Sequence, residues 1–202
     1  MLILLCAPVA GLAAPTILVY GDSLSAGYGV PRGQEWPSLL ARRLDQLGYR
    51  HAVVNASISG ETSSGGHTRI DHALAQHRPA LVILELGAND GLRGLPVTEM
   101  RRNLAAIIEA CRARQARVLL VGMRIPPNYG PRYTQEFHSS FRQLAQQYRI
   151  PLLEFLLDGV AGRRELTQDD GLHPTAAAQP RLLDNLWPVL APMLGKPLRP
   201  AS

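Results

Sequence analysis

The chain has 202 residues, a length that suits one domain with a full hydrophobic core. Its 46% hydrophobic and 18% charged residues exclude an intrinsically disordered chain. The formal net charge is +5 at pH 7, but the arginines are scattered or paired rather than clustered, so we expect no nucleic acid partner.

The N-terminal stretch resembles the later part of a secretory signal. Residues 2–13 are apolar and end in small residues, although they lack the basic region that precedes such a stretch. They are too few to span a bilayer, so no stable membrane insertion is expected. We predict that residues 1–13 are a signal peptide cleaved before Ala14 and that the protein is periplasmic or secreted. Cleavage would remove Cys6 and leave Cys111, which excludes an intramolecular disulfide.

Short apolar runs then alternate with longer amphipathic segments, a pattern typical of a parallel sheet wrapped by helices. The β-branched residues in the third run indicate a strand buried on both faces. The predicted strands are Ile17–Tyr20, Ala52–Asn55, Ala80–Leu86, Val118–Gly122 and Pro151–Phe155. The predicted helices are Glu35–Leu47, Thr98–Arg114 with Thr98 as a plausible N-cap, Gln135–Tyr148, and one that follows Pro174.

A candidate nucleophile follows the first strand. Ser23 lies in the small-residue sequence GDSLSAG of residues 21–27. A serine hydroxyl is a weak nucleophile unless a positioned base takes its proton. The alternative is a helix N-cap, for which Asp22, Ser23 and Ser25 all qualify. This motif alone does not decide between the two.

A candidate base lies near the C-terminus. Of six histidines, His173 is the one with a carboxylate three residues upstream in a loop-like context. Asp170 could orient the imidazole and stabilise its charged form, and Asp169 is the rival carboxylate. The alternative reading of Asp170 and His173 is a turn followed by a helix cap.

Three other histidines suggest a metal site at first sight. His67, His72 and His77 are five residues apart, however, and on a helix such steps turn successive side chains to different faces. We therefore predict surface histidines and no metal.

Two further residues follow the second and third strands. Read alone, Gly60 indicates a turn, and Asn89 an Asx-turn with Gly91. Ligands of open parallel sheets gather outside the carboxyl ends of the strands, so we expect both residues to meet Ser23 and the 170–173 segment at one edge. A backbone amide and a side-chain amide there can hold an oxyanion.

These four segments, in this order, resemble the sequence blocks of the GDSL or SGNH hydrolases, from about Thr16 to the last helix. The resemblance implies a three-layer α/β/α, flavodoxin-like fold with a central five-stranded parallel sheet, over residues 14–195 and followed by a tail, 196–202. It also implies a serine hydrolase that cleaves acyl esters and thioesters, as arylesterases, acyl-CoA thioesterases and lysophospholipases do, through an acyl-serine intermediate. The family pattern selects Asp170 over Asp169. The implied roles are Ser23 as nucleophile, His173 as base, Asp170 as its orienting acid, and Ser23, Gly60 and Asn89 as the oxyanion hole.

The resemblance extends to the expected substrate contacts. Residues 125–133 resemble the family segment that borders the acyl groove, and residues 91–95 resemble a mobile loop beside the site. The expected substrate-binding residues are therefore Leu92, Pro127 and Tyr129. No cofactor is implied, and the expected protein is a monomer whose partner is a small-molecule acyl ester or thioester.

Two alternatives remain open at this point. One is an SGNH carbohydrate esterase that removes acetyl groups from a glycan, and the other is a non-catalytic lipid- or glycan-binding domain. No Gly-x-Ser-x-Gly elbow, P-loop, paired-cysteine zinc pattern or dinucleotide fingerprint is present. Asp90 and Glu61 are expected to make local hydrogen bonds that hold their loops.

Overall fold

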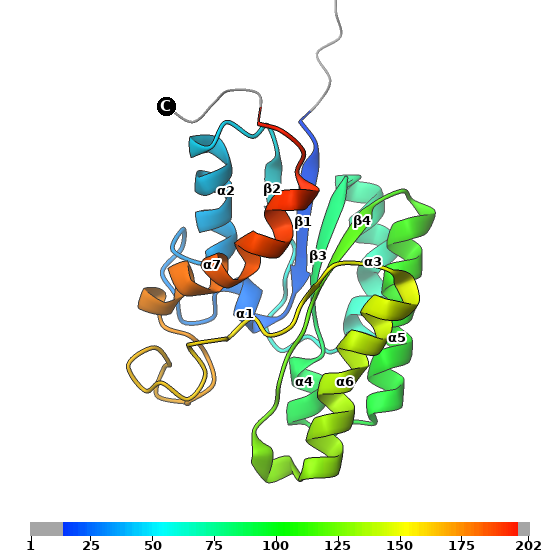
Figure 1. Cartoon of the computed structure of the whole chain (residues 1–202), viewed down its shortest axis with the longest axis vertical. Helices are drawn as coiled ribbons and strands as arrows, with labels where there is room; N and C mark the ends of the chain where they lie inside the picture. Colours follow the sequence, from blue (N-terminus) through cyan, green and yellow to red (C-terminus); the bar gives the residue numbers. More distant parts are fainter. Residues whose placement is uncertain (1–13, 198–202) are drawn as a thin grey trace, which may run out of the picture.

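Five parallel strands form one sheet in the order β2-β1-β3-β4-β5 (Figure 1). The computed structural model describes residues 14–197, so the expected signal peptide and residues 198–202 of the expected tail lie outside the described residues. The predicted five-stranded parallel sheet is confirmed. Its strands are β1 (Thr16–Gly21), β2 (Ala52–Asn55), β3 (Leu81–Glu85), β4 (Arg117–Val121) and β5 (Leu152–Leu153).

The middle strand is buried along its whole length. Every residue of β3 is inaccessible, and β3 pairs with β1 from Ile17 opposite Leu81 to Gly21 opposite Glu85. A continuous apolar run suits this position, because helices cover both faces of a parallel sheet. Glu85, the last residue of β3, is the one charged side chain in that run.

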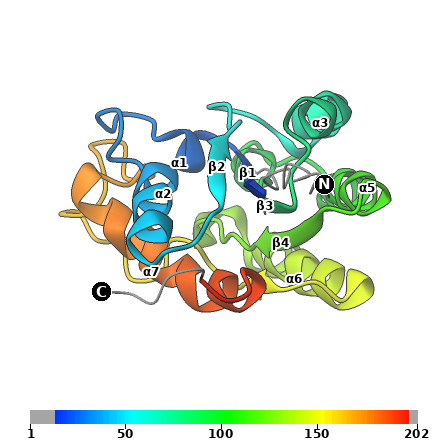
Figure 2. The ribbon, with the colours of Figure 1, turned by 90° about the horizontal axis from the view of Figure 1, so that it is seen from above.

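Helices form a layer on each side of the sheet (Figure 2). α2 and α7 pack together on one face, while α3, α5 and α6 pack side by side on the other. The helices are α1 (Ser23–Ala26), α2 (Trp36–Gln46), α3 (Ser63–His77), α4 (Ala88–Leu92), α5 (Val97–Ala113), α6 (Pro131–Tyr148) and α7 (Gln179–Leu190). Short 3₁₀ turns are η1 (Pro127–Tyr129), η2 (Ala176–Ala178) and η3 (Ala191–Met193). Within the described range, no helix is long and apolar enough to cross a membrane.

Proline explains two of the differences between the predicted and the observed helix starts. Thr98 is not the N-cap of α5, because Pro96 takes that place and its carbonyl accepts from the amides of Glu99 and Met100. α6 begins at Pro131, four residues earlier than predicted, because the fixed φ of proline suits the first helical turn.

One long helix was not predicted. α3 has two glycines in its first turns, and glycine disfavours a helix. Gly66 is needed there because a Cβ atom would lie 2.4 Å from Leu86 Cδ1, and Tyr20 Oη donates to the Gly66 carbonyl at 2.7 Å. Close approach to the sheet therefore outweighs the weak helix propensity of this segment.

The carboxyl ends of the strands share one edge with several loops. α1 and α4 lie at this edge, together with the long segment between β5 and α7 (Figure 1). This arrangement brings residues from the first, third and last strand connections close together.

Candidate active site

Ser23 is the first residue of the short helix α1. Asp22 is the N-cap, and its Oδ1 accepts from the Leu24 amide at 3.0 Å. Gly27 ends the helix in the left-handed conformation, with φ 77°. The N-cap alternative therefore applies to Asp22, while the Ser23 side chain remains available for other contacts.

A continuous chain of hydrogen bonds connects Ser23 to His173 and Asp170. Ser23 Oγ lies 2.8 Å from His173 Nε2, and His173 Nδ1 lies 2.6 Å from Asp170 Oδ2. The amides of Leu172 and His173 both donate to Asp170 Oδ1 at 2.9 Å. The turn between Asp170 and His173 passes through Gly171, whose φ of 68° suits glycine.

The environment of Asp170 keeps it ionised. Burial raises the pKa of this carboxyl, but the hydrogen bonds from the His173 ring and from two backbone amides outweigh it and lower the pKa to about 2. An ionised Asp170 accepts a hydrogen bond from Nδ1–H, which keeps the proton on Nδ1 and leaves the lone pair of Nε2 directed at Ser23. The arrangement can therefore withdraw a proton from the serine hydroxyl.

Asn89 and Gly60 make different contacts. Asn89 follows Gly87 at the start of α4, and its Nδ2 donates to Asp22 Oδ2 at 3.1 Å and to the Glu61 carbonyl at 3.0 Å. Gly60 is exposed with φ 79°, and Arg93 Nη2 donates to its carbonyl at 2.9 Å. Arg93 thus ties the Gly60 turn to the segment that follows α4.

A largely apolar cavity of about 610 Å³ opens beside Ser23, Asn89 and His173. Of the expected substrate-binding residues, Leu92 and Pro127 line this cavity and Tyr129 does not. The remaining lining residues are Asp22, Leu24, Ala88, Met123, Arg124, Ile125, Pro126, Phe155, Leu157, Ala161, Gly162, Gly171 and Leu172.

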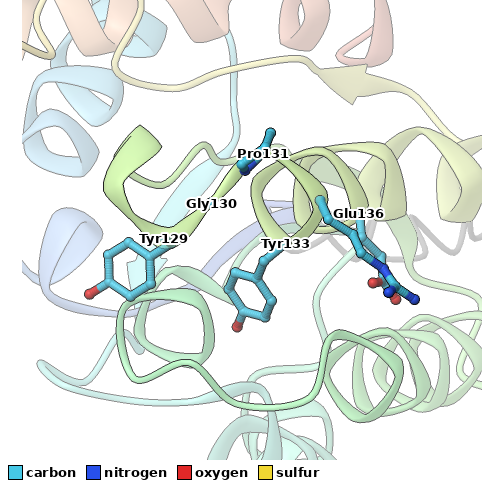
Figure 3. A pocket seen from close by; sticks show the side chains of 6 residues that line it. Tyr129, Gly130, Pro131, Tyr133 and Glu136 are labelled. Atoms are coloured by element: carbon cyan, nitrogen blue, oxygen red, sulfur yellow. The ribbon is translucent and has the colours of Figure 1, made fainter.

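Tyr129 instead lines a separate shallow pocket of about 360 Å³ with Tyr133 (Figure 3). The two rings stack at 6.4 Å between centroids. Tyr129 Oη donates to the Leu92 carbonyl at 2.7 Å, and Tyr133 Oη donates to the Leu95 carbonyl at 2.6 Å. The 91–95 segment, which the resemblance describes as a mobile loop, is therefore bonded at both ends to tyrosines.

Glu61 and Asp90 make local contacts. Glu61 pairs with Arg69, whose guanidinium lies 4.0 Å from the centre of the Tyr20 ring. Asp90 is buried and accepts from the amide and the hydroxyl of Ser63 at 2.8 and 2.6 Å. These bonds fix the start of α3 beside α4.

The sequence analysis missed two residues that contact the His173 loop. The Tyr28 ring lies 4.6 Å from the His173 ring, centroid to centroid. Gln168 Nε2 donates to the carbonyls of Tyr28 at 2.7 Å and Pro174 at 3.0 Å, and the Gln168 amide donates to the His173 carbonyl at 2.7 Å. Gln168 and Tyr28 are 140 residues apart, so no local pattern could reveal this contact.

Replacing Gln168 by alanine should lower kcat by about tenfold and change KM little, because a slight displacement of a catalytic group slows the chemical step. Steady-state kinetics on p-nitrophenyl esters measures this effect. Gln147→Ala, at an exposed position on α6, is the matched control. An unchanged kcat for Gln168→Ala would show that the hydrogen bonds of the Gln168 side chain do not position His173.

No group of three histidine, cysteine, aspartate or glutamate side chains in residues 14–197 could hold a metal ion. His67 and His72 are exposed on α3. Cys111 is a buried free thiol, and burial raises its pKa to about 12.

A serine, a histidine and an aspartate bonded in series at the carboxyl edge of a parallel sheet, next to an apolar cavity, are typical of a serine hydrolase. The GDSL-like Lipase/Acylhydrolase family matches residues 19–180, and the chain belongs to this family. The protein is accordingly an esterase of the SGNH type.

Three known proteins show how close the similarity is. The chain is 50% identical to Esterase TesA of Pseudomonas aeruginosa over 90% of each chain. It is 42% identical to Thioesterase 1/protease 1/lysophospholipase L1 of Escherichia coli K12, over 90% of this chain and 86% of the relative. The crystal structure of the psychrotrophic esterase EstA from Pseudoalteromonas, inhibited by monoethylphosphonate, has a TM-score of 0.85 and 43% identity over 90% of this chain and 99% of EstA.

Proposed function

We propose that the protein hydrolyses small-molecule acyl esters and thioesters through an acyl-Ser23 intermediate. The observation that carries this proposal is the unbroken series of contacts from Ser23 Oγ through both ring nitrogens of His173 to Asp170. His173 Nε2 takes the proton as Oγ attacks the acyl carbon, and the same proton then passes to the leaving alcohol or thiol. Water activated by His173 next cleaves the acyl-serine bond, which releases the acid and restores Ser23.

The charge that develops on the acyl oxygen needs donors. The proposed donors are the amides of Ser23 and Gly60 and Nδ2 of Asn89. Both Nδ2 protons of Asn89 have protein acceptors here, Asp22 and the Glu61 carbonyl. To bind the oxyanion, Nδ2 must therefore redirect or share one of these two hydrogen bonds. The Glu61 carbonyl is a neutral acceptor, so a negatively charged oxyanion can compete with it for the Nδ2–H group.

The shape of the cavity favours acyl chains longer than acetyl. Its volume of about 610 Å³ and its apolar lining offer burial to a hydrocarbon chain. The E. coli relative is named as a thioesterase and lysophospholipase, which supports fatty acyl groups as the substrate class. Rates on acetyl, butyryl and octanoyl esters test this choice, and a clear preference for acetyl would instead favour the carbohydrate esterase alternative.

The proposed setting is the periplasm or the medium, and the proposed state is a monomer. The composition of residues 2–13 supports export. Among residues 14–197, the exposed large hydrophobic side chains are Tyr28, Ile58, Leu95 and Leu172, which belong to separate loops and support the proposed monomer.

A fluorophosphonate should label Ser23 and stop ester hydrolysis, because the activated Oγ attacks phosphorus as it would an acyl carbon. EstA, named as inhibited by monoethylphosphonate, gives the precedent. Peptide mass spectrometry would place the adduct, and heat-denatured protein serves as the unlabelled control. Labelling at a different serine, or inhibition without an adduct, would contradict Ser23 as the nucleophile. The absence of both ester hydrolysis and labelling would favour the alternative of a non-catalytic domain.

A further inference from the structure

Asp22 contacts Asn89, one of the proposed oxyanion donors, and the helix that begins with Ser23. It is fully buried, precedes Ser23 and caps α1 through the Leu24 amide. Its second oxygen, Oδ2, accepts from Asn89 Nδ2 at 3.1 Å. One carboxylate thus connects the helix that presents Ser23 to the side chain proposed as an oxyanion donor.

A second buried carboxyl group, that of Glu85, contacts the backbone of Asp22. Glu85 Oε2 accepts from Ser25 Oγ at 2.6 Å and from the Asp22 amide at 3.3 Å. Gly21 leaves room for this contact, since a Cβ atom at that position would lie 2.5 Å from Glu85 Oε2. Glu85 therefore joins the end of β3 to the start of α1.

Buried carboxyl groups are costly and need a compensating role. The reaction scheme gives neither Asp22 nor Glu85 a proton to transfer. Their contacts instead determine where the Ser23 amide and the Asn89 side chain lie. Such contacts can set catalytic rate without touching the substrate.

We propose that Asp22, held by Glu85, is a positioning residue that fixes the Asn89 amide in its donating orientation. This inference rests on the proposed function, since it acts through the proposed oxyanion hole. A carboxylate at Asp22 can only accept, so it requires the NH₂ end of Asn89 to face it. The amide of Asn89 cannot then rotate to present its oxygen to the developing negative charge.

The charge states of the pair agree with this role. Burial raises the pKa of Asp22 to about 6, although the Leu24 amide, His173 and Asn89 oppose the rise. Burial, and then the charge of Asp22, raise the pKa of Glu85 well above its usual value. The Asp22 carboxyl therefore ionises as the pH rises through about 6, and the charge that it then carries favours the protonated form of Glu85.

The first test is Asp22→Asn. The new amide can still accept from Leu24, but its NH₂ group would face the NH₂ group of Asn89, so that Asn89 must move. We expect kcat to fall by about 10²-fold with KM changed less than about twofold. The unfolding midpoint of Asp22→Asn at pH 7.5 should not fall. The pKa of the Asp22 carboxyl is higher in the folded than in the unfolded protein, so stability is lost as the pH rises through about 6. The variant removes this destabilising charge.

A double-mutant cycle separates positioning from a merely structural role. If Asp22 acts through Asn89, the double variant Asp22→Asn/Asn89→Ala should have the same kcat as Asn89→Ala, whereas independent effects would multiply. Ile107→Val, in the buried face of α5, is the control for stability alone. An Asp22→Asn enzyme with unchanged kcat, or a multiplicative double variant, would overturn the inference.

The pH profile gives a second readout. His173 from the loop before α7, Glu85 from β3 and Asp90 from α4 are the ionisable groups that act on Asp22. Protonation of Asp22 leaves one carbonyl oxygen to accept from both the Leu24 amide and Asn89, which weakens the hold on Asn89, so the acid limb of log kcat should be steeper in the wild type than in Asp22→Asn. Equal slopes would contradict the role of Asp22. Fluorophosphonate labelling of Ser23 in the same preparations shows whether the proposed function itself stands.

Discussion

Replacing Ser23 by alanine is expected to lower kcat by about 10⁶-fold and leave substrate binding largely intact, since it removes the only atom proposed to bond to the acyl group. Ester hydrolysis under single-turnover conditions, together with the Kd of a non-hydrolysable analogue, measures both effects. The fold should persist because Asp22 caps α1 through its own carboxylate.

Ser25 provides a matched control for that variant on the same helix. Its Oγ donates to Glu85 at 2.6 Å and does not contact His173, so Ser25→Ala should lose far less activity than Ser23→Ala. If the two variants were equally impaired, the loss would reflect damage to α1 rather than loss of the nucleophile.

Asp170→Asn should lower kcat by about 10⁴-fold near neutral pH. An asparagine amide facing Nδ1 favours the tautomer that carries its proton on Nε2, and that nitrogen then cannot accept from Ser23. The structure places the rival carboxylate Asp169 in a different polar pocket, with Arg164 and Gln168. Asp169→Asn should therefore stay within about twofold of the wild type.

The pH dependence gives a second test of the role of Asp170. The pKa of Asp170 is lowered to about 2, so Asp170 remains ionised and should contribute no inflection between pH 4 and 9. Rate profiles on a neutral ester over this range provide the measurement. If kcat fell more in Asp169→Asn than in Asp170→Asn, the carboxylate that orients His173 would be Asp169 and not Asp170.

The sheet could be predicted because its strands are apolar runs between polar turns. β3 illustrates this, since burial on both faces leaves an uninterrupted apolar pattern. α3 could not be predicted in the same way, because its fit depends on Gly66 leaving space for Leu86 and on the hydrogen bond from Tyr20 to the Gly66 carbonyl. Tertiary contact there outweighs local propensity.

The same limit applies around the site. Ser23, Asp170 and His173 belong to short motifs, and the strand order explains why those motifs share an edge. Gln168 belongs to no motif, because its contact with Tyr28 arises only when loops 140 residues apart meet. Glu85 did carry a signal, since an acid inside an otherwise apolar buried strand must have a partner.

The two bonds of His173 differ greatly in how much chain they enclose. The contact with Asp170 spans three residues, whereas the contact with Ser23 spans 150. The first can form within a single loop, but the second requires the ends of the domain to be docked, and distant contacts of this kind form slowly because of their entropy cost. During refolding, regained turnover thus reports the final docking of the C-terminal segment, which far-ultraviolet circular dichroism would not distinguish from earlier helix formation.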